Sequence, residues 1–269
     1  MISAKVAGLS IFPIKSLEGQ SLTQVKILPS GALQHDREFA LFDSDQRFVN
    51  GKRQPKVHLI RCRIDLDTHR IALKLQDCDQ VFSGHLEQDR EAIHRWLSDF
   101  FGFPVTLQEN PDTGFPDDLN ANGPTLISTA TLETLASWYP TLTVEDLRQR
   151  LRTNIEIDGV PPFWEDQLFS QVGTCVRFQL GEVIVEGINP CQRCVVPSRD
   201  VLTGAPIPNF PKIFTQQRQQ TLPTWTVADR FHHFYRVAVN TTIPSTEAGK
   251  QIQVGDALQI LGVGASALA

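Results

Sequence analysis

The hydrophobic and polar positions of the first hundred residues mostly follow the period of β-strands. The predicted strands are 2–12, 38–42, 47–49, 64–66 and 71–75. A polar DTHR segment, residues 67–70, separates the last two and predicts a hairpin turn. Alternation of this kind predicts strands with one buried face, because successive side chains of a strand point to opposite sides.

One segment of this region follows the period of a helix. Apolar side chains recur at i, i+3, i+4 and i+7 from Ile93 to Phe100, and Gly102 and Pro104 follow. This spacing places them on one face of a helix, and the two following residues predict where it ends.

Residues 110–124 (NPDTGFPDDLNANGP) are dense in Pro, Gly, Asn and Asp and predict a linker. We therefore expect an N-terminal β-rich domain at 1–112 and a second domain at 120–265. Helices are predicted at 129–138 and after Thr143-Val-Glu-Asp146, a capping-box pattern. The further predicted strands are 154–157, 176–180, 183–186, 235–239 and 252–260. The expected fold class is mixed, β-rich α+β, in which the second domain is a β-barrel with flanking helices.

Composition narrows the class of protein. Of 269 residues, 41% are hydrophobic and 20% charged, and the formal net charge is -5. This balance is typical of a globular protein and argues against general nucleic-acid or polybasic membrane binding. We expect no membrane segment and no secretory signal, because no long apolar run occurs. Five scattered cysteines do not resemble a secreted disulfide framework, so a cytoplasmic location is expected.

The stretch NPCQRCVVPSRDVLTG, residues 189–204, places two cysteines beside arginines. Half of a zinc site, a thiol–disulfide redox pair and two core cysteines are all compatible with C-x-x-C. A second pair of zinc ligands is not visible, and Val195-Val196-Pro197 does not start a helix. A fourth interpretation is one thiolate bound to a soft metal whose other ligands come from an organic cofactor.

Several motifs together resemble those of MOSC-domain proteins, the family related to the C-terminal part of molybdenum cofactor sulfurases. The similarity covers nearly the whole chain and is nearest to the two-part branch that includes the mitochondrial amidoxime-reducing component and its bacterial relatives. The motifs are FPIKS at 12–16, HDR at 35–37, LRTN at 151–154, CQRC at 191–194, DVLTG at 200–204 and QVGD at 253–256.

The resemblance implies a molybdenum–pterin cofactor whose metal is bound by Cys194. The residues it implies around the cofactor are Lys15, Ser16, Arg37, Ser128, Arg152, Asn154, Arg193 and Thr203, and those implied near the reaction are Cys194, Asp200 and Tyr235. Arginine and hydroxyl groups suit this role because they bind phosphate oxygens through directed hydrogen bonds.

Each of these residues also has an ordinary structural interpretation. Lys15 and Ser16 follow a strand, and Arg37 has acidic neighbours. Arg152 is placed to offset a helix dipole, and Asp200 is placed to cap a helix or close a turn. Asn154 is a candidate turn residue and Tyr235 a candidate core residue, and these alternatives stay open.

The function implied by the resemblance is reduction of N-hydroxylated or N-oxide-type small molecules at molybdenum. No iron–sulfur ligand pattern occurs, so electrons are expected from a separate ferredoxin-, cytochrome- or flavin-type protein. We expect a monomer. Two alternatives use the same residues: a carrier of the cofactor without turnover, and a sulfur-transfer protein with a persulfide on Cys194. We expect no room in this chain for the pyridoxal-phosphate domain that sulfurases use.

Overall fold

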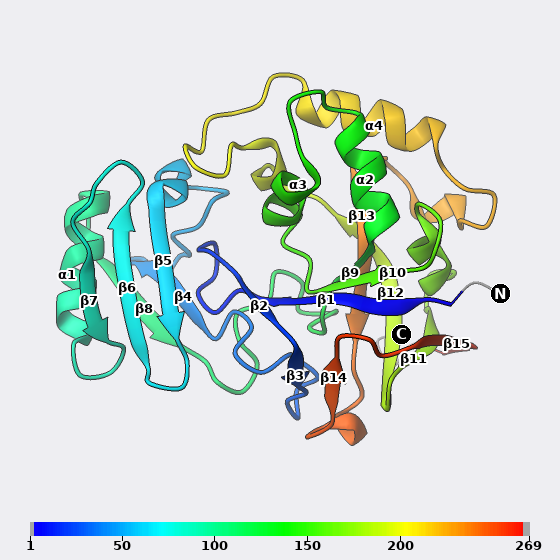
Figure 1. Cartoon of the computed structure of the whole chain (residues 1–269), viewed down its shortest axis with the longest axis horizontal. Coiled ribbons are helices and arrows are strands. Elements are labelled where there is room, and N and C mark those ends of the chain that lie inside the picture. The colour runs from blue at the N-terminus through cyan, green and yellow to red at the C-terminus, as the bar shows by residue number, and fades with distance from the viewer. Residues whose placement is uncertain (1–2, 266–269) are drawn as a thin grey trace.

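The computed structural model describes residues 3–265 and contains two parts that lie side by side (Figure 1). The smaller part holds the strands and the helix of residues 39–109. The larger part is built around an eight-stranded sheet. The mixed, strand-rich α+β class predicted from the sequence is confirmed.

The smaller part contains two separate sheets and one helix. Strands β4 (Phe39–Asp43) and β8 (Val105–Glu109) pair antiparallel, and β5 (Ile60–Asp65), β6 (Arg70–Leu75) and β7 (Phe82–His85) form a second sheet. The predicted hairpin at 64–75 is confirmed by the β5–β6 register. Helix α1 (Arg90–Phe101) ends at Gly102, whose φ of 81° is the left-handed conformation that glycine adopts without strain.

The large sheet has the strand order β15-β11-β12-β13-β9-β10-β1-β2. Its strands are β1 (Lys5–Ile11), β2 (Gln20–Leu22), β9 (Leu126–Ser128), β10 (Ile155–Asp158), β11 (Thr174–Leu180), β12 (Val183–Gln192), β13 (Arg236–Thr242) and β15 (Leu258–Ala265). Since β1 pairs with β10, the N-terminal strand belongs to the sheet of the second half of the chain. The domain boundaries at 112 and 120 stay a prediction.

The described strands do not form the closed barrel that the sequence led us to expect. The hydrogen-bonded order is open, from β15 to β2. Two backbone bonds of 2.8 Å, from Val6 to Asp256 and from Leu258 to Ala4, nevertheless bring the start of β15 close to β1. Hydrogen bonds near one end of these strands curl the sheet without continuing into a full ladder.

Three helices cover one side of this sheet (Figure 1). They are α2 (Thr129–Ser137), α3 (Val144–Leu151) and α4 (Phe210–Gln220). The predicted capping box is present: Thr143 accepts the Asp146 N–H, and the Asp146 carboxylate accepts the Thr143 N–H. Helix α4 was not predicted, although its buried Phe210 and Phe214 lie four residues apart on one face.

The sequence also predicted single strands where the structure has breaks. The segment 252–260 divides into β14 (Gln251–Gln253), which pairs with β3 (Gln24–Lys26), and β15, because Gly255 turns the chain with φ of 98°. Residues 47–49 make only an isolated bridge, and Ile2 lies outside the described residues. The 3₁₀ helices are η1 (Pro55–Leu59), η2 (Trp164–Leu168), η3 (Val196–Ser198), η4 (Ala228–Arg230) and η5 (Ser245–Glu247).

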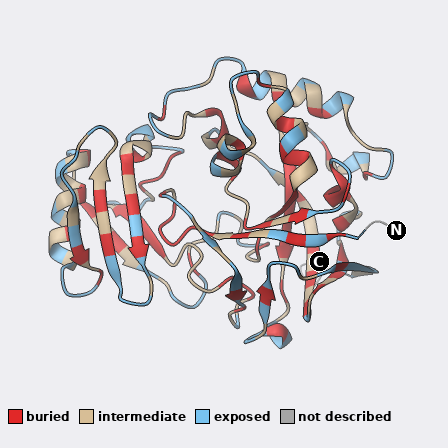
Figure 2. Ribbon diagram, in the orientation of Figure 1, coloured by how far each residue is buried: buried red, intermediate tan, exposed pale blue. Residues whose placement is uncertain are grey.

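Buried side chains form a separate apolar core in each part, and a third lies beneath the helices (Figure 2). Between the two parts the chain therefore lacks a continuous apolar core, and polar side chains line the space there. Within residues 3–265, no helix combines the length and apolar character that crossing a bilayer requires.

Candidate functional site

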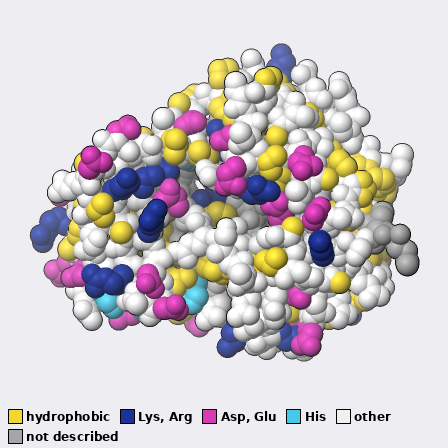
Figure 3. Space-filling view, viewed as in Figure 1, with side chains coloured by type: hydrophobic (Ala, Val, Ile, Leu, Met, Phe, Trp, Pro, Cys, Tyr) yellow, Lys and Arg dark blue, Asp and Glu magenta, His cyan; other side chains and the backbone are white. Residues whose placement is uncertain are grey.

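A cleft of about 1480 Å³ lies along the junction of the two parts. Its walls come from the loop after β1, from η1 and β5, from the end of α3 and from the segment after β12. Figure 3 shows the surface hollowed between the two parts, with Lys and Arg side chains near the opening. The motifs quoted from the sequence, far apart along the chain, therefore meet at one place.

Lys15 and Ser16 line the cleft immediately after the first strand. Strand β1 ends at Ile11, and the Lys15 N–H donates to the Phe39 carbonyl at 2.8 Å, which fixes the loop against β4. Lys15 is only 5% exposed. Its Nζ donates to the Phe115 carbonyl at 2.8 Å and lies 3.0 Å from Asp117. Burial lowers the pKa of Lys15, and the Asp117 carboxylate partly offsets that effect.

Arg152 occupies the C-terminal end of α3 in a left-handed conformation, with φ of 53°. Its guanidinium does not cap that helix; Nη1 donates to the Leu17 carbonyl at 2.6 Å, and the group lies 4.1 Å from the centre of the Phe12 ring. Nη2 is buried and has no hydrogen-bond partner among the described residues. Burial and the neighbouring Arg37 lower the pKa of Arg152 to about 9.

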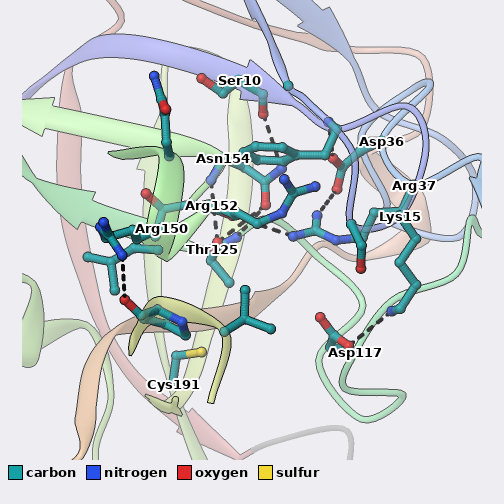
Figure 4. Close-up of a pocket in the computed structure, with 18 of the residues that line it drawn as sticks. Ser10, Lys15, Asp36, Arg37, Asp117, Thr125, Arg150, Arg152, Asn154 and Cys191 are labelled. Atoms are coloured by element: carbon teal, nitrogen blue, oxygen red, sulfur yellow. Dashed lines mark hydrogen bonds and ion pairs between the residues drawn. The ribbon is translucent and has the colours of Figure 1, made fainter. Parts of the chain in front are cut away.

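Arg37 lies beside Arg152 and lines the same wall (Figure 4). It forms an ion pair with Asp36 and donates from Nη2 to the Arg152 carbonyl at 3.4 Å. Asn154 is also on this wall, but its side chain is fully used: it bonds to Thr125 and donates to the Ser10 carbonyl at 3.1 Å. Asn154 therefore ties β1 to β10, which keeps the wall in place.

Cys191 and Cys194 both line the cleft, one within β12 and one just after it. The Cys194 sulfur accepts the Val196 N–H at 3.5 Å. Burial raises the pKa of Cys191, and Arg193 acts in the opposite direction. Arg193 is held by the carbonyls of Val237 at 3.1 Å and Leu151 at 2.9 Å, which leaves its buried Nη2 without a partner among residues 3–265.

Four residues implied by the resemblance do not line the cleft. Ser128 is fully buried and caps α2 by accepting the Thr131 N–H at 3.1 Å. Asp200 closes a turn in which its Oδ1 accepts the N–H and the hydroxyl of Thr203, both at 2.9 Å. Tyr235 packs edge-on against a phenylalanine of α4, and its hydroxyl is buried without a partner in the described chain. Burial raises the pKa of Tyr235, and the nearby Cys194 adds to that effect.

Sequence reasoning missed several charged residues of the cleft. Lys52, His58, Arg61, Asp117 and Arg199 all line it. They come from four separate segments, so no spacing along the chain marks them as a group. Arg199 lies within the quoted cysteine stretch, and its position beside two cysteines was the one available signal.

Several arginines of the cleft have buried guanidinium nitrogens with no hydrogen-bond partner among the described residues. A guanidinium N–H that is buried without a partner costs free energy, because its water is lost and nothing replaces it. Arg152 and Arg193 both carry such an N–H beside the two thiols. Within the described residues no group of three or more His, Cys, Asp or Glu side chains is placed to hold a metal ion. The two arginines and the two cysteines therefore suit an anionic ligand that contains a metal ion, because one thiolate could bind that metal.

Comparisons with known proteins agree with the motifs. Residues 3–104 match the MOSC N-terminal beta barrel domain and residues 125–259 match the MOSC domain. The molybdenum cofactor sulfurase of Caenorhabditis briggsae is 23% identical over 94% of this chain and 36% of its own length, and that of Danio rerio is 25% identical over 66% of this chain and 28% of its own. The chain thus spans about a third of these relatives. A solved structure, the YuaD protein from Bacillus subtilis, is 13% identical over 98% of this chain and 97% of its own, with a TM-score of 0.40.

Proposed function

The chain belongs to the MOSC-domain family, and we propose from this that its cleft binds a molybdenum–pterin cofactor and reduces N-hydroxylated or N-oxide-type small molecules. The observation that carries the proposal is the pair of buried, unpartnered guanidinium donors of Arg152 and Arg193 beside the thiols of Cys191 and Cys194. A ligand that is an anion and carries a thiophilic metal would accept hydrogen bonds from the guanidinium groups and bind a thiolate through its metal.

The wall with Lys15, Ser16, Arg37 and Arg152 would hold the phosphate end of the cofactor, because all four line the cleft and Arg37 and Arg152 lie side by side there (Figure 4). Each charge-assisted hydrogen bond contributes on the order of 1.5–3 kcal/mol, so a few retain a ligand tightly. Asn154 acts by fixing the strands behind these groups. Lys15 pairs with Asp117, which Lys52 shares, and Arg37 pairs with Asp36. Among residues 3–265, Arg152 is the cation of this wall that has no carboxylate within 4 Å.

Cys194 would bind the metal, and Arg193 holds the loop that carries this cysteine through its bonds to Val237 and Leu151. When bound, the cofactor would supply the two-electron chemistry that removes oxygen from an N–O group. Tyr235 lies near Cys194 but does not line the cleft, so its protonated hydroxyl would act on the cysteine loop from behind the cleft wall. Asp200 acts indirectly, by shaping the loop after the cysteines.

Electrons would come from a separate ferredoxin-, cytochrome- or flavin-type protein, and we propose a cytoplasmic monomer. A second candidate function is sulfur transfer through a persulfide on Cys194, or delivery of the cofactor without turnover. The sulfurase names of the relatives favour this candidate. Cys191 lines the same cleft, and its thiolate could attack the inner sulfur of such a persulfide, which would form a Cys191–Cys194 disulfide and release the outer sulfur as hydrosulfide.

Protein made in a cofactor-competent host separates these functions. A reductase retains molybdenum and pterin and reduces benzamidoxime with an artificial electron donor. A sulfur carrier instead releases thiocyanate on treatment with cyanide and shows no turnover. Molybdenum-containing protein that does neither would contradict the reductase and the sulfur carrier, and would support delivery of the cofactor without turnover. Cys78→Ser, at a partly buried thiol that does not line the cleft, is the matched control for cysteine variants.

A further inference from the structure

A second group of basic side chains lines the cleft beside those assigned to the cofactor. We call it the arginine wall: His58 on η1, Arg61 on β5, Arg150 on α3 and Arg199 after η3. All four line the cleft, and each has a side-chain nitrogen that is buried without a hydrogen-bond partner among the described residues.

The arginine wall is held firmly by backbone contacts. Arg61 donates to the His58 carbonyl and to Val201 across the junction of the two parts, at 3.4 Å in the second case. Arg150 donates to the Arg199 carbonyl, and Arg199 donates from Nη1 to Gly204 at 3.2 Å. These contacts fix the orientation of the guanidinium groups. Because the acceptors are uncharged backbone carbonyls, the contacts do not neutralise the positive charge.

The charges of the wall do not balance. Arg61 pairs with Glu18 at 3.0 Å, and Arg150 lies 3.5 Å from Asp200. Among residues 3–265 the three guanidiniums of the wall face two ion-pair carboxylates, which leaves one positive charge, and Arg199 is the one with no carboxylate within 4 Å in that range. His58 responds to this excess: burial, and then Arg152, Arg199, Arg61 and Arg150, lower its pKa to about 4. The imidazole is therefore neutral at pH 7.

His58 is closely packed against two glycines. Gly51 and Gly204 both lie against the ring: a Cβ on Gly51 would meet His58 Nε2 at 3.1 Å, and a Cβ on Gly204 would meet Cδ2 at 3.3 Å. Gly204 also has a φ of 71° and approaches the Pro55 carbonyl. The two glycines therefore leave room for the imidazole between the loop at Gly51 and the turn at Gly204.

We propose that the arginine wall is a subsite for a carboxylate group on the substrate. The proposal rests on the proposed function, and it narrows the substrates to anionic N-oxygenated compounds. One excess positive charge matches one carboxylate, whereas a phosphate dianion would exceed it. The planar guanidinium of Arg199 suits a carboxylate because two parallel N–H groups meet its two oxygens.

Calorimetry on molybdenum-loaded protein without an electron donor tests the subsite independently of turnover. The probes are benzamidoxime and 4-carboxybenzamidoxime, which differ by one carboxylate. We expect the carboxylated probe to bind more tightly. In Arg199→Gln the ratio of the two dissociation constants should fall roughly tenfold, the lower range for one charge-assisted hydrogen bond. Arg199→Lys should restore part of the ratio, and Arg70→Gln, at an exposed arginine on β6, should leave it unchanged.

Equal affinity of the wild type for both probes would contradict the carboxylate subsite. If that protein still binds molybdenum and reduces benzamidoxime, the proposed function is not affected. Loss of molybdenum and of turnover would instead contradict the proposed function. If the Arg199-dependent preference occurs in cofactor-free protein and disappears on loading, the wall belongs to the cofactor and the substrate proposal is wrong.

Discussion

At the scale of single residues, the cleft combines cations that have counterions with cations that have none. Lys15 pairs with Asp117, which Lys52 shares, and Arg37 pairs with Asp36, whereas Arg152 is buried against Phe12 and its Nη2 has no hydrogen-bond partner among the described residues. Burial without a counterion is costly, and a chain that keeps such a group gains from it only when a ligand arrives. Arg152 is therefore the residue whose removal should affect an anion most.

Arg152→Met should keep the fold and release the cofactor during purification. The change removes charge while a side chain of similar length still covers Phe12, and the loss of one charge-assisted bond weakens binding roughly tenfold or more. The measurement is pterin per protein, read by fluorescence after oxidation. Arg95→Met, at an exposed arginine of α1, is the control. Full pterin occupancy in Arg152→Met would show that Arg152 does not contribute to binding of the cofactor.

Glu165 is a second buried charge, outside the cleft. It is fully buried, and neither carboxylate oxygen has a hydrogen-bond partner within residues 3–265. Burial and the adjacent Asp166 raise its pKa from 4.5 to about 7. Between these pH values the folded chain keeps a proton that the unfolded chain releases. The stability from this group is therefore complete below pH 4.5 and is lost as pH rises through 7.

Glu165→Gln should flatten that dependence. The variant lacks the titrating group, so its free energy of unfolding relative to the wild type should rise with pH, by up to about 1.4 kcal/mol per unit in this window. Urea unfolding at several pH values measures the difference. Glu133→Gln, at an exposed carboxylate of α2, should show no such trend. Parallel curves for wild type and Glu165→Gln would show that Glu165 is ionised in the folded state.

At the scale of elements, the site depends on where α3 stops. The helix begins with the Thr143–Asp146 capping box and ends at Arg152, so one short element carries both Arg150 and Arg152 to the cleft. Its buried Leu147 and Leu151 face the core beneath the helices. An eight-residue helix is not stable alone, and the cap and this packing together decide that it forms.

Thr143→Ala should lower the free energy of unfolding by about 1 kcal/mol, because the amide of Asp146 loses its acceptor. For a chain of this size that corresponds to a melting temperature about 2–4 °C lower. Thermal unfolding measures it. Thr141→Ala, at an exposed threonine outside the helix, is the control. An unchanged melting temperature would mean that packing alone holds the helix.

Elements with strong local signals were predictable from the sequence, and the others were not. The β5–β6 hairpin and the capping box follow from residues close in sequence. Helix α4 was missed because its Gln-rich second half carries no apolar residues that continue the spacing of Phe210 and Phe214. The break at Gly255 was missed because apolar residues continue on both sides of the glycine.

At the scale of the whole molecule, the cleft exists because β1 leaves the N-terminal region and pairs with β10. That pairing brings the loop with Lys15 and Ser16 to the end of α3 and to the segment after β12. Sequence alone could group the motifs only through family resemblance, since strand order depends on contacts between distant residues. For the same reason it could not place Ser128 or Thr203 away from the cleft, or bring His58 and Arg61 into it.

The central claim is that the Cys194 sulfur holds a metal in this cleft. Its most direct test is the molybdenum-to-protein ratio, measured by elemental analysis on wild type, Cys194→Ser and Cys191→Ser made in a cofactor-competent host. We expect molybdenum in the wild type, none in a folded Cys194→Ser protein, and most of it retained in Cys191→Ser. Undiminished molybdenum in Cys194→Ser would contradict the claim, and equal loss in both variants would replace it with a site of two thiolates.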